Sequence, residues 1–215
     1  MAFFNPEIPL LSRKPAAGDL SATAQVWRVQ CQVGAFTLWS AFYTRHDQAC
    51  LNWGLLTASI FAIAQFVPLS WITQAIMASA LTGLGCGAMA WLTWRYTAVE
   101  QLAWILYSWL GLMLLGTVIT DLSLWCSWSR IVMEICPLWL GICDVGYLIT
   151  GLGMRSRLIL LCSGLHILTI GLLPYVGGWQ PLLTGLVISG SALVLAELQW
   201  DSNGVCNYRT LESLC

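Results

Sequence analysis

Charged side chains are scarce in this sequence. Of its 215 residues, 9% are Asp, Glu, Lys or Arg, whereas an average soluble domain carries about 25%. So little charge cannot cover the surface of an ordinary water-soluble enzyme, and a disordered chain would combine high charge with low hydrophobicity. The nine Lys and Arg residues are balanced by ten Asp and Glu residues. No basic face is therefore available for a nucleic acid.

Side chains that commonly hold cofactors are also rare. The one lysine, Lys14, precedes every long apolar run, so no span offers an amine for a retinal Schiff base. A single histidine, His166, falls within a predicted span, which excludes bis-histidine haem ligation within the chain. The motifs of zinc proteases and of phosphate-binding loops are missing. The sequence therefore assigns no catalytic residue, and the cofactor is left unknown.

Long apolar runs are what the sequence has in abundance. Hydrophobic residues make up 58% of the chain, and a helix of about 20 apolar residues crosses a bilayer core. We predict an all-α, polytopic membrane bundle whose one transmembrane domain covers residues 49–200. Its six spans are predicted at residues 51–67, 71–94, 102–125, 131–154, 158–174 and 181–200.

The segments outside these spans are predicted less directly. Residues 1–20 contain three prolines and are expected to form an irregular tail, as are residues 201–215. In residues 21–48, apolar side chains such as Val29 and Val33 recur at helical spacing among polar ones. This pattern predicts an amphipathic or interfacial helix. A seventh, polar span is the alternative.

Basic residues lie almost entirely on one side of the predicted bundle. Arg130 alone belongs to the opposite side. The positive-inside rule therefore predicts that both termini are cytoplasmic, or in an equivalent compartment such as a stroma. The basic residues on the majority side are Arg13, Lys14, Arg28, Arg45, Arg95, Arg155, Arg157 and Arg209.

A strip of small residues follows one face of the second predicted span. Ala75, Ser79, Gly83 and Gly87 are spaced four residues apart, and such strips let two helix backbones approach closely. One interpretation is close packing within the bundle. The other is a face for a partner subunit or a second copy of the chain.

Ionisable residues cluster near the outer ends of the third and fourth spans. Arg130 and Glu134 are four residues apart, which places them on one helix face, and Asp121 is close enough to join them. The group is either an interfacial ion cluster that closes a helical hairpin or the outer mouth of a solute or proton path.

Asp144 and His166 are predicted near the bilayer midplane, where ionisable groups are costly. The fourth and fifth spans are sequential, so a hydrogen bond between the two side chains is geometrically plausible. The pair either locks two helices together or forms a proton relay or ligand site. A metal site is a weaker alternative that would use Cys143, Cys162 and His166.

Three functional hypotheses follow from these features. The first is a structural, assembly or accessory subunit that acts in the lipid bilayer beside a partner membrane subunit or as a homo-oligomer. The second is a small-solute, ion or proton transporter or channel that uses Asp144 and His166. The third is a membrane enzyme that acts on a lipid or quinone.

Overall fold

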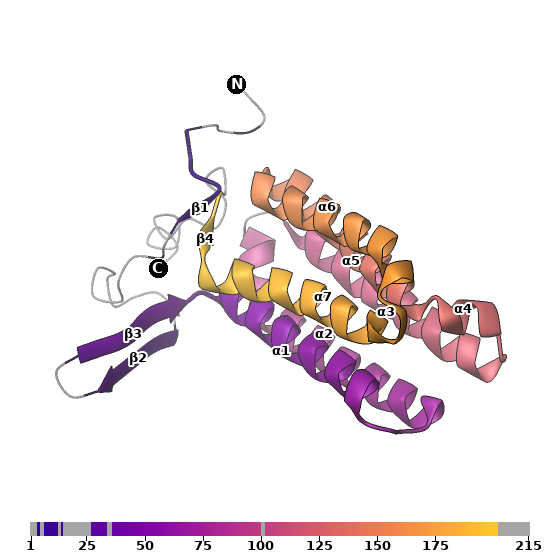
Figure 1. Ribbon diagram of the computed structural model, residues 1–215. Coiled ribbons are helices and arrows are strands. Elements are labelled where there is room, and N and C mark those ends of the chain that lie inside the picture. Colours follow the sequence, from indigo (N-terminus) through magenta and orange to yellow (C-terminus); the bar gives the residue numbers. More distant parts are fainter. Residues whose placement is uncertain are drawn as a thin grey trace.

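The protein is described here by a computed structural model that covers residues 4, 7–12, 14, 27–33, 36–99 and 102–201. Six of its helices are long and apolar enough to cross a membrane, and two of these spans include a short 3-10 turn at one end. Large apolar side chains cover their outward faces, as expected where lipid surrounds a bundle. The predicted all-α multi-pass bundle is confirmed. The long helices are α1 (Arg45–Phe66), α2 (Trp71–Val99), α3 (Ala103–Trp125), α5 (Ile135–Met154), α6 (Arg157–Leu172) and α7 (Gln180–Glu197), with η1 at Leu173–Tyr175 and η2 at Gly177–Trp179 (Figure 1).

The segment predicted as an amphipathic helix contains a β-hairpin, so that prediction for residues 21–48 is wrong. Strand β2 (Trp27–Val33) pairs antiparallel with β3 (Phe36–Tyr43), and the hairpin extends from one end of the bundle (Figure 1). The physical reason is the period of the sequence. From Arg28 to Val33, polar and apolar residues alternate one by one, which suits a strand rather than a helix. The alternative of a seventh span is also replaced by this hairpin.

Helix α1 begins at Arg45, ahead of the predicted start at residue 51, because a capping box forms there. The Thr44 hydroxyl accepts a hydrogen bond from the Asp47 amide at 3.2 Å, and the Asp47 carboxylate accepts one from the Thr44 amide at 2.8 Å. Two backbone donors at the helix start are thus satisfied. The helix ends before Pro68, since the residue that precedes a proline is driven to extended backbone, as Val67 is.

The fourth predicted span is broken near its start. A short helix, α4 (Ser129–Met133), is followed by Glu134 as its C-cap, and α5 begins at Ile135. Pro137 explains the break. It has no N–H to donate to the carbonyl of Met133, and its ring clashes with that carbonyl in a continuous helix.

The first and last long helices lie side by side (Figure 1). Glycines make this approach possible. A Cβ on Gly185 of α7 would lie 2.5 Å from the Cβ of Phe61, and a Cβ on Gly54 of α1 would lie 2.8 Å from the Leu193 side chain. The same two ends of the chain meet again outside the helices. Strand β1 (Leu11–Ser12) pairs antiparallel with β4 (Gln199–Trp200).

Candidate functional site

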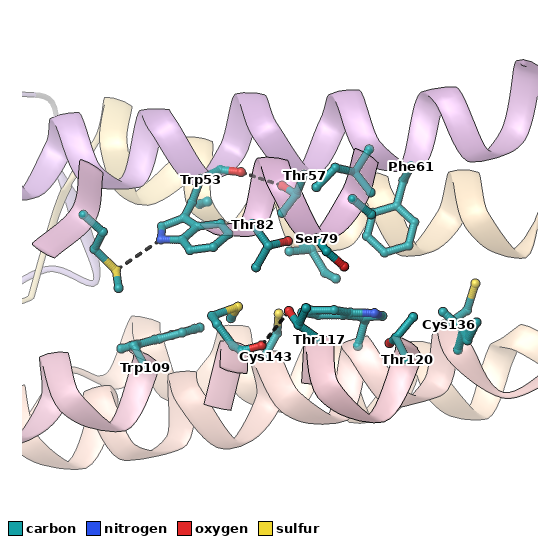
Figure 2. Close-up of a pocket in the computed structure, with 18 of the residues that line it drawn as sticks. Trp53, Thr57, Phe61, Ser79, Thr82, Trp109, Thr117, Thr120, Cys136 and Cys143 are labelled. Atoms are coloured by element: carbon teal, nitrogen blue, oxygen red, sulfur yellow. Dashed lines mark hydrogen bonds between the residues drawn. The ribbon is translucent and has the colours of Figure 1, made fainter. Parts of the chain in front are cut away.

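An elongated cavity of about 440 Å³ lies inside the bundle. Helices α1 and α2 form one wall and α3 and α5 the other, with further contributions from α7 (Figure 2). Its lining extends from His46 and Thr97 at one end to Gly178 and Gln180 at the other. Gln65, near the end of α1, hydrogen-bonds to the Gly178 carbonyl at 3.2 Å, which joins two elements at the second end.

The cavity lining is apolar and uncharged. Aromatic side chains such as Trp53, Trp109 and Trp139 contribute to it, together with Met113 and other aliphatic residues. Among the described residues that line it, none is Asp, Glu, Lys or Arg. An ionic group could not be buried here without a large desolvation penalty. The cavity is thus suited to an apolar, uncharged molecule.

Hydroxyl groups interrupt this apolar lining, and most of them are already hydrogen-bonded. Thr57 donates to the Trp53 carbonyl at 2.7 Å and Thr117 to the Met113 carbonyl at 2.9 Å, as helical threonines commonly do. Ser79 donates to the carboxylate of Asp121, with distances of 2.9 and 3.0 Å to its two oxygens.

Two of the cavity threonines are different. Thr82 and Thr120 are only 6% and 8% exposed, and both line the cavity. The Thr120 hydroxyl is buried without a hydrogen-bond partner, and the Thr82 hydroxyl has none among the described residues. Figure 2 shows both side chains at the gap between the two walls, near Ser79 and Thr117. Buried hydroxyls without partners are uncommon because desolvation is costly.

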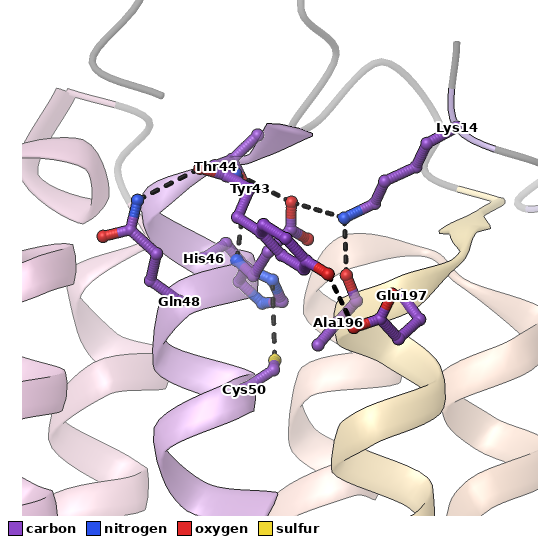
Figure 3. Close-up of polar contacts among 9 residues, drawn as sticks. Lys14, Tyr43, Thr44, His46, Gln48, Cys50, Ala196 and Glu197 are labelled. Atoms are coloured by element: carbon purple, nitrogen blue, oxygen red, sulfur yellow. Dashed lines mark hydrogen bonds and ion pairs between the residues drawn. The ribbon is translucent and has the colours of Figure 1, made fainter. Parts of the chain in front are cut away.

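A buried polar cluster lies where α1 begins and α7 ends (Figure 3). Lys14 forms an ion pair with Asp47 at 2.7 Å and donates to the Ala196 carbonyl at 2.5 Å. Tyr43 donates to Glu197 at 2.8 Å. The N-terminal segment is thereby fixed to both helices.

His46 connects this cluster to the cavity, since it lines the cavity and belongs to the first turn of α1. Its Nδ1 lies 3.7 Å from the Cys50 sulfur, and its ring centroid is 5.6 Å from that of Trp200. These contacts hold the imidazole between α1 and the segment that follows α7.

Asp201, just after α7, caps the start of α6. Its carboxylate accepts hydrogen bonds from the Ser156 hydroxyl at 2.9 Å, from the backbone amides of Arg157 and Leu158 at 3.0 and 3.1 Å, and from Arg157 Nε at 2.8 Å. Burial raises the pKa of Asp201, but the hydrogen bonds from Arg157, Leu158 and Ser156 outweigh this effect and hold the pKa below its ordinary value. The carboxylate therefore stays ionised at neutral pH.

The structure does not join Asp144 to His166. Asp144 accepts a hydrogen bond from the hydroxyl of Ser163, one turn before the histidine. His166 is fully buried, and its Nδ1 lies 2.7 Å from the Cys162 carbonyl. Its ring packs on Tyr147 with centroids 5.0 Å apart, and its Nε2 has no partner. Neither Asp144 nor His166 lines the cavity.

The weaker metal hypothesis has no support in the geometry. Within the part of the chain that the structure describes, no group of three His, Cys, Asp or Glu residues is placed to hold a metal ion. Cys143 faces the cavity, whereas its neighbour Asp144 bonds to Ser163, because consecutive residues on a helix point about 100° apart. His166 uses its Nδ1 on the carbonyl of Cys162.

The outer ion cluster is not formed either. Arg130 and Glu134 are both exposed, and no ion pair among the described residues includes either of them or Asp121. The break at Glu134 removes the helical geometry that would place it beside Arg130. Asp121 instead receives the hydroxyl of Ser79.

The strip of small residues on α2 divides into two parts. Ala75 and Ser79 line the cavity. Gly83 and Gly87 are exposed, and a Cβ built on either would meet nothing within 4 Å. No described helix therefore packs on the two glycines.

Sequence reasoning missed the cavity hydroxyls and the buried role of Lys14. Helical threonines at cavity level carry no distinct sequence signal, because which face of a helix lines a cavity depends on packing. Lys14 had one available signal, as the single lysine of the chain. Comparisons with protein-family models, curated proteins and solved structures gave no match to this chain.

Proposed function

We propose that this membrane protein binds an elongated, uncharged, lipid-like molecule inside its bundle. The observation that carries the proposal is the apolar cavity of about 440 Å³. Ligand pockets typically measure about 300–1,000 Å³ and are lined mainly by apolar and aromatic side chains. The proposed function is binding or carriage of a membrane-soluble small molecule. Lipids and quinones, the substrates of the third hypothesis from the sequence, belong to this class.

The energetic cost of an unfilled cavity also favours a bound molecule. An unfilled apolar cavity is unfavourable because its lining side chains lose van der Waals contacts on one side. A filled cavity avoids this loss.

Native mass spectrometry of the gently extracted protein, with extraction of the bound molecule, tests the proposal. The expected result is an approximately stoichiometric apolar small molecule that is not bulk phospholipid. Ala78, which lines the cavity, provides the blocking variant Ala78→Phe. Exposed Ala80 on the same helix provides the matched control, Ala80→Phe. We expect a tenfold or greater loss of bound molecule in the first variant and no loss in the second. An empty protein, or phospholipid insensitive to Ala78→Phe, would contradict the proposal.

An accessory subunit is the second candidate, favoured by the exposed glycines of α2. Nothing within the described chain covers Gly83 and Gly87, and strips of small residues serve as helix contacts in membranes. The same mass measurement checks this candidate, because a partner subunit or a second copy adds its mass. Gly83→Leu is expected to abolish that association, and an unchanged complex would argue against it. No comparable observation favours transport through Asp144 and His166.

The proposed orientation keeps both ends of the chain in the cytoplasm or its equivalent. The pairing of β1 with β4 supports placing the two ends on one side, and the bias of basic residues selects which side. Exposed Cys126, at the end of α3, then lies on the opposite side. A membrane-impermeant maleimide added to intact cells or organelles should label Cys126. Labelling only after permeabilisation would reverse the orientation.

A further inference from the structure

We infer that the cavity recognises one uncharged oxygen group of its ligand, a hydroxyl or a carbonyl, through the hydroxyls of Thr82 and Thr120. This inference rests on the proposed function and names the class of molecule bound. The ligand is an elongated apolar molecule with such a group at one end, of the kind represented by a quinone ring or a long-chain isoprenoid alcohol.

The first argument is the unused hydrogen-bonding capacity of the two threonines. Thr93 and Thr117 also line the cavity, yet each donates its hydroxyl to the carbonyl one turn earlier, at 2.7 and 2.9 Å. Thr82 and Thr120 make no such bond, although both are more than nine-tenths buried. Neither hydroxyl has a partner among the described residues. The Thr120 oxygen is inaccessible in this conformation, so rotation about the Cα–Cβ bond has to turn it toward the cavity before it can donate to an oxygen there.

The second argument is position. Ser79 and Asp121, directly hydrogen-bonded, fix α2 to α3 at this level, and the neighbours Thr82 and Thr120 project into the cavity there (Figure 2). Residues on α2 also line the cavity on both sides of this level, as far as Trp71 and Thr97. At 1.5 Å per residue, the part toward Thr97 extends about 22 Å beyond Thr82, and the part toward Trp71 about 12 Å beyond Ser79. We therefore place the oxygen group at the level of the two threonines and the apolar chain in the longer part.

The third argument is charge. Because no Lys or Arg is among the described lining residues, a phosphate or carboxylate would lose its hydration without gaining a counter-ion. His46 lies at the far end of the longer part, well separated from the two threonines along α2 and α1. The recognised group is therefore neutral.

Brominated probes of equal chain length provide a direct test, since bromine quenches tryptophan fluorescence on contact. The probes are bromododecane, ω-bromododecanol, the corresponding ω-bromo methyl ketone and ω-bromododecanoate, titrated into the full-length protein in detergent. Trp53, Trp71, Trp109 and Trp139 line the cavity and are the reporters. Quenching that Ala78→Phe abolishes separates them from the exposed tryptophans on the outer surface. We expect the alcohol, the ketone or both to bind at least tenfold more tightly than the alkane, and the carboxylate to bind no better than the alkane.

Matched valine variants assign the effect to the two hydroxyls. Thr82→Val and Thr120→Val keep the side-chain shape, and each is expected to weaken binding of the oxygenated probe about five- to tenfold without changing alkane binding. Thr169→Val is the control, because that buried hydroxyl donates to the Leu165 carbonyl and the residue does not line the cavity. If all four probes bind equally and the valine variants have no effect, the inference is wrong while ligand binding stands. If no probe binds in a manner sensitive to Ala78→Phe, the proposed function itself fails.

Discussion

Lys14 and Asp47 form an ion pair with 2.7 Å between Nζ and Oδ2, although each side chain is only 8% exposed. The pair joins residues 33 positions apart in the sequence and fixes the N-terminal segment at the start of α1. Because the Asp47 carboxylate also closes the capping box, the ion pair and the helix start share one group.

Removal of the lysine charge is therefore expected to be costly. Lys14→Met leaves the Asp47 carboxylate buried without its counter-ion, and we expect a loss of about 3–5 kcal/mol. The combined variant Lys14→Met/Asp47→Asn should lose less than the sum of the single changes. Thermal unfolding in detergent measures both. The control is Arg130→Met, an exposed site without an ion pair among the described residues. Equal effects of Lys14→Met and Arg130→Met would show that the buried pair is not formed.

Stability should also depend on acid pH through Asp201. Its folded-state pKa lies below the ordinary value of 3.8, so the ionised carboxylate stabilises the folded state above that pH. The contribution is lost as the pH falls below about 4 and through the folded-state pKa. Asp201→Asn should lower stability at neutral pH by about 1–3 kcal/mol and make the unfolding midpoint less dependent on pH between about 5 and 3. A variant with the same pH dependence as the wild type would exclude this role.

Glycine positions on α5 provide a matched pair. A Cβ on Gly146 would lie 2.6 Å from the Trp109 ring, which is held by a hydrogen bond from its Nε1 to Thr150 at 2.8 Å. Gly146→Ala is thus expected to destabilise the protein by about 1–3 kcal/mol. Gly141, on the same helix, has nothing within 4 Å of such a Cβ. Gly141→Ala should be neutral or stabilise by up to about 1 kcal/mol, since alanine favours helix. The unfolding midpoints of the two variants test this prediction. If Gly141→Ala destabilised the protein more than Gly146→Ala, α3 and α5 would pack differently.

A double-mutant cycle tests the partner of Asp144. Ser163→Ala removes the hydroxyl that donates to this carboxylate, with an expected loss of about 1–3 kcal/mol in the wild-type background. In the Asp144→Ala background the same change should cost at least about 0.5 kcal/mol less. His166→Phe should be coupled to Asp144 more weakly than Ser163→Ala is, because the interaction of the histidine with Asp144 is electrostatic and involves no hydrogen bond. If Asp144 were instead coupled strongly to His166 and not to Ser163, the result would support the Asp144–His166 pair expected from the sequence.

The number and type of the long helices could be predicted because the thickness of the bilayer sets how many consecutive apolar residues a spanning helix needs. The end of α1 before Pro68 follows from proline chemistry, and so would the break before Pro137. The hairpin was mispredicted because the apolar residues of that segment satisfy a helical spacing as well as a strict alternation. The capping box at Thr44 and Asp47 carries a readable signal at the start of α1.

The candidate site was less accessible to sequence reasoning. Asp144 and His166 attract attention because ionisable groups are rare in spans, yet a serine one turn away satisfies the aspartate. Thr82 and Thr120 resemble every other helical threonine in the sequence. What distinguishes them is the absence of a partner in three dimensions, which depends on how α2 and α3 face the cavity.

The contact between α1 and α7 sets the order in which the protein can assemble during its synthesis. The face of α1 that carries Gly54 and Phe61 is made first, and its packing partner, α7, is made after four intervening long helices. Until α7 has entered the membrane, Gly54 and Phe61 face lipid or the insertion machinery rather than their final neighbour. The bundle therefore closes late in translation, and a chain interrupted before Gln180 leaves its first helix without the surface against which it packs.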